Sequence, residues 1–121
     1  MQVQDRRKQP RKKLTAFTPV YLSEKRTLLG YVRDLSLHGA MVIGEKALEI
    51  ETQLTLQIDF PGDLPGISAT QVTLPARVVR CIPDASPHSF NLGFEFSEVG
   101  PEQARILQAL LDRYHFGYRV A

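Results

Sequence analysis

The chain of 121 residues contains one cysteine, no tryptophan and no long run of apolar residues. Because Cys81 is the only cysteine, an internal disulfide is excluded and a cysteine-rich metal site is not expected. The missing apolar run argues against a membrane span, and the charged start lacks the apolar segment of a secretory signal. These absences favour a reducing, cytoplasmic setting. Without tryptophan, any surface that stacks on a base must use arginine, tyrosine or aliphatic groups.

Familiar catalytic motifs are missing as well. The sequence has no HExxH pair, no GxSxG turn and no glycine-rich phosphate loop, and His38, His88 and His115 stand in unrelated contexts. Ser36 and His38 lie two residues apart without a third group to orient them, so a nucleophile–base pair is not expected. Asp34 and His38 lack a converging third metal ligand. We therefore expect neither an enzyme nor a metal site.

The charge is divided unevenly along the chain. Residues 1–13 hold six basic residues and one acidic residue, a net charge of +5, whereas residues 14–121 have a net charge of −3. A basic segment of this kind is typical of an arm that binds nucleic acid, a phosphate ligand or an acidic partner, although a basic tail can also be merely solvated. Since Pro10 disfavours a helix there, we expect a flexible basic arm at 1–13 followed by one folded domain at 14–121.

Apolar and polar residues alternate along several short segments, as in β-strands that bury one face. The alternation is unbroken in residues 53–60 and again in residues 90–96. The adjacent residues Val78 and Val79 interrupt it, which indicates a β-bulge or a bend, and Pro19 indicates a strand edge or a bulge. The expected strands are residues 14–22, 28–33, 40–43, 53–60, 68–82 and 90–96.

A single helix is expected after the last strand. Gly100-Pro101-Glu102 combines a proline with an acidic residue at its start, and Gly117 is a suitable end. Six short strands joined by turns and followed by one helix predict a mainly β domain, either an antiparallel barrel or a strongly curved sheet. The predicted apolar face of the helix consists of Ala104, Leu107, Leu111 and Tyr114, widened by Ile106 and Leu110.

The segment Asp34-Leu35-Ser36-Leu37-His38-Gly39 lies between two predicted strands and carries a small set of polar groups. The side-chain oxygens of Asp34 and Ser36 can accept hydrogen bonds from nearby backbone N–H groups or face outward as short acceptors. Gly39 allows a positive φ or the close approach of another molecule. The segment is therefore consistent both with an ordinary turn and with a recognition surface.

The spacing of two arginines in the arm favours the recognition surface. Arg7 and Arg11 lie four residues apart, and a guanidinium group can pair with phosphate, pair with the O6/N7 edge of guanine, or stack on a base. An aspartate can accept hydrogen bonds from the N1–H and amino groups of guanine. The arm could therefore fold over a ligand that contains guanine and phosphate and is seated on Asp34, Ser36 and Gly39.

These two motifs, RxxxR at 7–11 and DxSxxG at 34–39, resemble those of the PilZ domain family in their order and separation. The segment at 92–96, a glycine followed by aromatic residues, is similar to a late strand of the same family. The resemblance covers nearly the whole chain. It implies a six-stranded antiparallel β-barrel that acts as a bacterial receptor for cyclic di-GMP, with this dinucleotide as its ligand and no further cofactor.

The resemblance also implies a role for each residue of the two motifs. Arg7 and Arg11 would grip phosphates and guanine edges from the arm. Asp34 and Ser36 would hydrogen-bond a guanine on the barrel surface. Gly39 would keep that surface open.

Four further residues are candidates for the same ligand. Arg6 stands directly before RxxxR, where an arginine in this family goes with an intercalated pair of ligand molecules, so two cyclic di-GMP molecules per domain are expected. Arg77 and Arg80 could reach the ligand from the long strand, or they could be ordinary exposed charges. His38 could contribute to the site or simply face solvent.

Taken with the resemblance, the sequence predicts a stand-alone adaptor that is monomeric without ligand. Binding would fold the arm onto the barrel and change the surface offered to a downstream partner protein, which the sequence does not identify. One alternative is a small barrel that binds single-stranded nucleic acid, and another is a PilZ-like interaction module without ligand. The intact motifs count against the second. The first is disfavoured because the regular aromatic residues share the inward face of their strands, namely Phe60, Phe90, Phe94 and Phe96.

Overall fold

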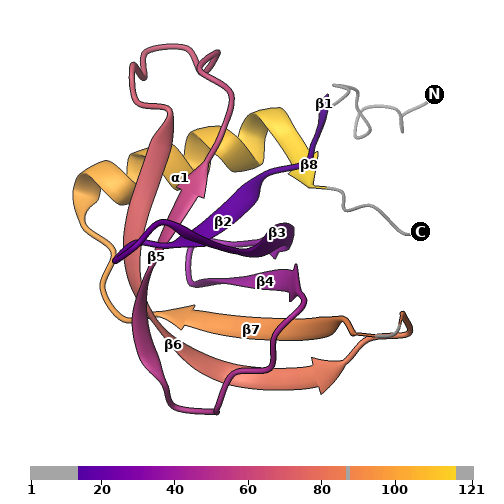
Figure 1. Cartoon of the computed structure of the whole chain (residues 1–121). Helices are drawn as coiled ribbons and strands as arrows, with labels where there is room; N and C mark the ends of the chain where they lie inside the picture. The colour runs from indigo at the N-terminus through magenta and orange to yellow at the C-terminus, as the bar shows by residue number, and fades with distance from the viewer. Residues whose placement is uncertain (1–13, 87, 117–121) are drawn as a thin grey trace, which may run out of the picture.

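Six strands close into an antiparallel barrel in the computed structural model, in the order β2-β3-β4-β7-β6-β5 (Figure 1). The structure describes residues 14–86 and 88–116. The helix α1 lies against the barrel, and the short strands β1 and β8 form a separate two-stranded sheet. This arrangement confirms the predicted six-stranded antiparallel barrel with a C-terminal helix. The elements are β1 (Leu14–Ala16), β2 (Pro19–Leu22), β3 (Thr27–Leu35), β4 (Gly39–Gly44), β5 (Gln53–Asp59), β6 (Gln71–Pro83), β7 (Phe90–Phe96), α1 (Pro101–Arg113) and β8 (Tyr114–Phe116).

The first predicted strand is divided into two elements with different partners. β2 belongs to the barrel and begins at Pro19, where the missing N–H group of proline does least harm to the ladder. β1 pairs in parallel with β8, with Leu14 opposite Tyr114 and Ala16 opposite Phe116. The prediction of one continuous strand from 14 to 22 was therefore wrong, because the chain changes sheets between β1 and β2.

The helix ends earlier than predicted. Its last residue is Arg113, and the expected end at Gly117 lies outside the described residues. Tyr114 already has extended backbone angles, φ −124° and ψ 152°, because it begins β8 and pairs with Leu14. A partner one hundred residues earlier in the chain leaves no mark on the local sequence pattern.

The buried face of α1 is narrower than predicted. Ile106, Leu107 and Leu110 are buried, whereas Ala104 and Leu111 are only half-buried. The buried line therefore combines Leu107 of the expected face with Ile106 and Leu110, which had been expected only to widen it. Within residues 14–86 and 88–116, the structure contains no helix with both the length and the apolar character that crossing a bilayer requires.

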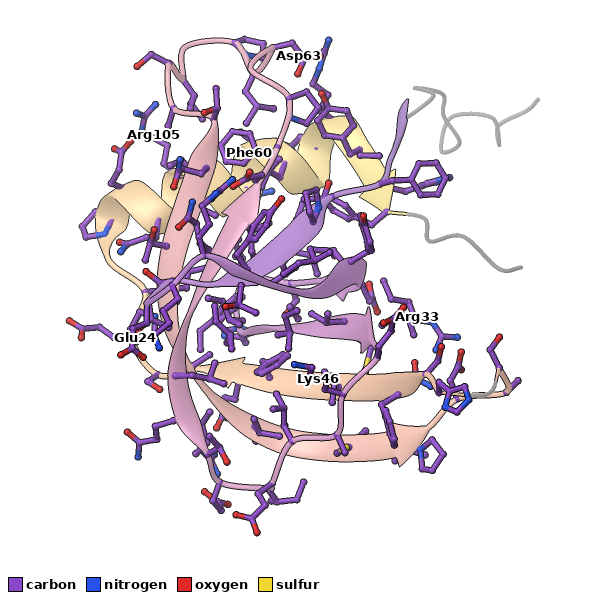
Figure 2. The ribbon with its side chains drawn as sticks, in the orientation of Figure 1. Glu24, Arg33, Lys46, Phe60, Asp63 and Arg105 are labelled. Atoms are coloured by element: carbon purple, nitrogen blue, oxygen red, sulfur yellow. The ribbon has the colours of Figure 1, made fainter. Side chains whose placement is uncertain are left out.

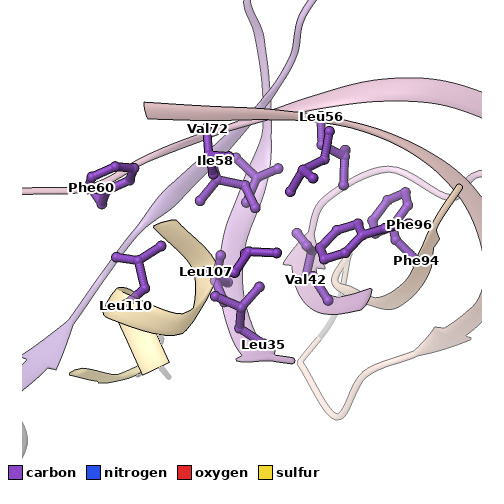
Figure 3. Packing of buried hydrophobic residues seen from close by; sticks show 14 of the residues in the cluster. Leu35, Val42, Leu56, Ile58, Phe60, Val72, Phe94, Phe96, Leu107 and Leu110 are labelled. Atoms are coloured by element: carbon purple, nitrogen blue, oxygen red, sulfur yellow. The ribbon is translucent and has the colours of Figure 1, made fainter. Parts of the chain in front are cut away.

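The core of the barrel continues into the buried face of the helix (Figure 3). Leu107 and Leu110 of α1 face the same interior as Leu35, Ile58 and Phe60 of the barrel. Burying one such leucine fully contributes about 1.5–3 kcal/mol. The helix is thus part of the core that fixes the strands, and the surface that these strands present depends on it.

Asp63 attaches the loop between β5 and β6 to the end of α1 (Figure 2). Its carboxylate accepts a hydrogen bond from the Tyr114 hydroxyl and another from Arg113, with Arg113 Nη2 3.2 Å from Asp63 Oδ2. The hydrogen bond from Tyr114, supported by Arg113, lowers the pKa of Asp63 below its ordinary value. Burial is the main cause that raises the pKa of Tyr114. This contact fixes the point at which the helix gives way to β8.

Candidate ligand-binding site

Two β-bulges flank a shallow pocket on the outer face of the barrel. In β3 the pairing with β4 shifts directly before Asp34, and in β6 the pairing with β7 shifts directly before Arg80. The shift in β6 confirms the bulge predicted near Val79. Each bulge exposes two consecutive residues, Arg33 with Asp34 and Val79 with Arg80. Because a bulge redirects the side chains beside it, an acid and a base are turned outward on two different strands.

The registers of four strands place these two residues in one row. Asp34 of β3 is opposite Met41 of β4. Met41 is in turn opposite Gly93 of β7, and Gly93 is opposite Arg80 of β6. Neighbouring strands lie about 4.8 Å apart, so the row spans about 14 Å. The carboxylate and the guanidinium group therefore stand at the two ends of a floor formed by Met41 and the bare backbone of Gly93.

The turn after β3 is closed by the hydroxyl group of Ser36. Ser36 Oγ accepts hydrogen bonds from the N–H groups of His38 and Gly39, at 3.1 and 3.2 Å, and the Ser36 N–H group donates to the Gly39 oxygen at 2.9 Å. Asp34 Oδ1 accepts the N–H group of Leu35 at 3.0 Å. Asp34, Ser36 and His38 are nevertheless exposed. The segment is thus both a hydrogen-bonded turn and a polar surface.

Two glycines allow close packing around the pocket. A Cβ atom at position 39 would lie 2.2 Å from the oxygen of Phe94, so only glycine lets the start of β4 lie against β7. A Cβ atom at position 93 would lie 3.0 Å from Arg80 Cβ, and the next two carbons of that side chain are 3.8 Å away. Gly93 therefore gives the aliphatic part of Arg80 a flat backbone surface to lie on.

The pocket has a volume of about 360 Å³ and is formed by β3, β4, β6, β7 and the turn between β3 and β4. Among the described residues that line it, Arg80 is the only arginine or lysine, while Asp34 and Glu95 are acidic. The pocket therefore suits a ligand that donates hydrogen bonds to the carboxylates and carries a negative charge that can pair with Arg80. The lining residues are Asp34, Leu35, Ser36, His38, Gly39, Ala40, Met41, Val79, Arg80, Gly93, Phe94 and Glu95.

Arg77 is held beside the pocket by two carboxylates. Its Nη1 atom lies 2.9 Å from Glu51 Oε1, and its Nη2 atom pairs with Glu95. Glu51 in the first place, and Glu95 in the second, raise the pKa of Arg77 above its ordinary value. Arg77 does not line the pocket, but it balances the charge of Glu95, which does.

Arg33, the outward neighbour of Asp34, lies toward the hairpin between β6 and β7 (Figure 2). Its Nη1 atom donates to Asn91 Oδ1 at 2.5 Å, and Asn91 Nδ2 donates to Asp84 Oδ1 at 3.0 Å. These hydrogen bonds connect β3 to the hairpin. Of the two residues exposed by the bulge, Arg33 is thus occupied in the fold, while Asp34 faces the pocket.

Most of the predicted site residues that the structure describes are gathered at this pocket. The exception is Arg77, which takes part in the ion pairs just described. The described residues contain no group of three or more histidine, cysteine, aspartate or glutamate side chains that could hold a metal ion. The predicted residues that line the pocket are Asp34, Ser36, Gly39, His38 and Arg80. The predicted residues that lie outside the described part of the chain are Arg6, Arg7 and Arg11.

Sequence reasoning missed lining residues that belong to no motif. Met41 and Glu95 are the outward neighbours of buried residues on β4 and β7, so the strand alternation contained a signal for both. Their place in the pocket depends on which strands are neighbours, and the alternation does not reveal that. Gly93 stood in the predicted family-like strand, but its position opposite Arg80 depends on the bulge.

The chain matches the PilZ domain family over residues 5–113. This match includes the pocket and also the arginines of the basic arm, because it begins at residue 5. Among curated protein sequences, no match was found.

Two solved structures are similar to this fold. One is the Bacillus subtilis inhibitor of motility, MotI/DgrA, with a TM-score of 0.59 and 21% identity over 76% of this chain. The chain spans only 43% of that protein. The other is the PilZ domain of YcgR from Escherichia coli with c-di-GMP, with a TM-score of 0.56 and 18% identity over 79% of each chain. At these identities the likeness concerns the fold.

Proposed function

Since the chain belongs to the PilZ domain family, we propose that the pocket between Asp34 and Arg80 binds cyclic di-GMP. PilZ domains are noncatalytic modules that typically act as receptors for this dinucleotide. The ligand combines two guanines, which donate and accept hydrogen bonds at their edges, with two phosphates. A surface for it must therefore offer acceptors, donors and positive charge.

The single observation that carries the proposal is the row from Asp34 to Arg80. The Asp34 carboxylate can accept hydrogen bonds from the N1–H and amino groups of a guanine. Arg80 can pair with a phosphate or with the O6/N7 edge of the same or a second guanine. Met41 and Gly93 leave a flat floor between them on which a base can lie. The two polar ends and the open floor match a planar base that is attached to a phosphate.

The basic arm would supply the positive charge that the pocket lacks. Two phosphates would meet one arginine among the described lining residues, so further cations must come from elsewhere. The basic arm holds Arg7 and Arg11, whereas Arg33 and Arg77 are already engaged with Asn91 and with two carboxylates. The arm precedes β1, and the chain then runs beside β3, where Thr18 O accepts the N–H group of Val32 at 2.9 Å. An extended chain covers at most about 3.3–3.6 Å per residue, so Arg11 lies within about 11 Å of Leu14 and Arg7 within about 25 Å.

Ordering of this arm would be the output of the domain. Six cations that fold over a bound dinucleotide would change the charge and shape of the surface beside β3, which a downstream protein could read. Arg6 would extend the grip to a second, intercalated ligand molecule, giving two per domain. We expect the domain to do this as a monomer in the cytoplasm.

Binding of single-stranded nucleic acid is the less favoured function. Barrels of that kind stack successive bases on exposed aromatic side chains. Here Phe60, Phe94 and Phe96 are buried. The exposed aromatic residues Phe17 and Tyr31 lie outside the pocket.

Isothermal titration calorimetry of the full chain with cyclic di-GMP tests the proposal. We expect saturable binding with two ligands per chain, and Asp34→Ala should weaken it by about 1–3 kcal/mol, the value of a charge-assisted hydrogen bond. Glu98→Ala is the matched control, because it removes an exposed carboxylate that does not line the pocket. A folded protein that gives no binding heat, or equal affinities for the two variants, would refute the proposed site. Salt-dependent binding of oligonucleotides of any sequence would support the less favoured function instead.

A further inference from the structure

A second concave surface, larger than the ligand pocket, lies along β3 and the ends of β2 and β4. It has a volume of about 640 Å³ and shares no lining residue with the ligand pocket. Three of its large apolar side chains are exposed, with exposed fractions of 50% for Phe17, 49% for Leu28 and 42% for Tyr31. We refer to this surface as the apolar groove. Its lining residues are Phe17, Leu22, Thr27, Leu28, Leu29, Gly30, Tyr31, Ile43, Gly44, Glu45, Lys46, Leu48 and Ser89.

The floor of the apolar groove is backbone without side chains. Gly30 of β3 is paired with Gly44 of β4, and a Cβ atom at position 30 would lie 2.0 Å from the oxygen of Ile43. Both strands also pair on their other sides, within a closed barrel. No free strand edge is therefore available in the groove, and an occupant must bind through its side chains and not by adding a strand.

We propose that residues 117–121 of the same chain dock in the apolar groove. β8 ends at Phe116, which is paired with Ala16, and the next residue after Ala16 is Phe17 on the groove wall. Because β1 and β8 are parallel and in register, β8 ends beside the residue that directly precedes Phe17. β2 then runs beside β3 toward Leu28, along the groove. Five extended residues cover up to about 18 Å.

The composition of this segment fits the apolar groove. Its sequence is Gly-Tyr-Arg-Val-Ala, and docking in an extended form would put Tyr118 and Val120 on one side, with Arg119 on the other. The two apolar side chains match the leucine-rich walls, and Arg119 can approach Glu45 at the groove. The basic arm is a poor occupant by comparison, because residues 1–13 hold six cations and little apolar surface. This proposal is independent of the identity of the ligand.

Paramagnetic NMR of the full chain tests the docking. A nitroxide label is attached to Ala121→Cys in a Cys81→Ser background, which leaves one thiol in the chain. We expect the label to broaden the amide signals of Leu28, Gly30 and Gly44 most strongly, with a weaker effect at the ligand pocket. The control carries the same label with Tyr118→Ser and Val120→Ser, and there the signals of the groove should regain their intensity.

Two outcomes would overturn the proposal. Broadening that is confined to β1 and β8, and is equal in the labelled protein and its control, would mean that the segment does not enter the groove. Broadening of an isotope-labelled, spin-free protein by an added spin-labelled one would mean that the groove takes the segment of a second copy. A third variant, Leu28→Ser, checks the site from the other side: this exposed side chain is replaced without touching the core, and its loss should reduce the broadening at Gly30 and Gly44.

Discussion

The backbone oxygen of Phe94 lies so close to Gly39 that it leaves no space for a side chain at position 39. The Cβ atom of any other residue at position 39 would collide with the Phe94 oxygen. Since β7 is paired on both sides, that oxygen cannot easily move. The glycine of the DxSxxG segment is thus required by the fold, in addition to any role in keeping the surface open.

Gly39→Ala should therefore reduce stability before it affects any ligand. Overpacking of this kind costs about 1–3 kcal/mol in the free energy of unfolding, which urea denaturation measures. Gly62→Ala is the matched control, because its Cβ atom would meet only the terminal methyl group of Thr70, at 3.1 Å. We expect the control to change stability by no more than about 0.5 kcal/mol. Equal stabilities of the two variants would contradict the close approach seen here.

Ser36→Ala should open the turn after β3. The variant removes the oxygen that accepts the N–H groups of His38 and Gly39, and an equivalent loss at a helix cap costs about 1 kcal/mol. Ser36→Thr keeps the hydroxyl and should retain most of the stability. Chemical denaturation distinguishes the two. If Ser36→Ala is as stable as the wild type yet binds less cyclic di-GMP, the hydroxyl group acts on the ligand and not on the turn.

The arginines of the arm should matter as arginines and not only as charges. Arg7→Ala and Arg11→Ala should each weaken cyclic di-GMP binding about 10- to 100-fold in calorimetry, because a bidentate pair with phosphate or guanine is lost. Lys13→Ala removes the same charge from the same arm and should have a much smaller effect that disappears at high salt. Similar losses in all three variants would indicate a diffuse electrostatic attraction and would count against a specific grip.

Arg80 and Arg77 should respond differently to substitution, although both lie on β6. Arg80→Ala should weaken cyclic di-GMP binding about tenfold and leave the unfolding midpoint unchanged, because Arg80 lines the pocket. Arg77→Ala should weaken binding indirectly, since it leaves the Glu95 carboxylate unbalanced in the pocket that the proposed ligand's phosphates would enter. The double variant Arg77→Ala with Glu95→Gln should then recover wild-type affinity. A double variant that stays weak would show that Arg77 contacts the ligand itself.

The contact of Asp63 with α1 should make part of the stability depend on pH. Its pKa is lowered, by Tyr114 first and by Arg113 next, so its stabilising effect is complete above the unfolded pKa of about 4 and is lost as the pH falls through the lower folded value. Asp63→Asn removes this dependence. Wild type and variant should therefore differ most in unfolding midpoint near neutral pH and converge below about pH 4. A constant difference across this range would mean that the carboxylate charge is not involved.

The barrel strands could be predicted because each buries one face. Alternation gave β7 with its observed bounds and located the bulge in β6 between Val78 and Arg80. The bulge in β3 was not predicted, because the expected strand ended at Arg33 and the shift lies between Val32 and Asp34. The pair of β1 and β8 was not predicted either. Three-residue strands are too short to show a period, and their pairing is the most distant in the chain.

The candidate site could be predicted only as far as its motif. Asp34, Ser36 and Gly39 were identified from their spacing, and the structure places all three at one pocket. Arg77 and Arg80 could not be separated in advance, because the bulge between them decides which one faces the pocket. Met41 was missed, because the sequence does not show which residues of the neighbouring strands lie opposite this outward side chain.

The pairing of Leu14 with Tyr114 affects when, during synthesis and folding, the start of the folded domain becomes fixed. Hairpins such as β2–β3 and β6–β7 join strands that are near in sequence, and such contacts form early because they close short loops. The contact between β1 and β8 joins residues one hundred positions apart and must therefore close a far longer loop. On a ribosome, β1 would thus find its partner only after residues 114–116 have emerged. Until then, the basic arm would precede a strand, β1, that has no partner to pair with.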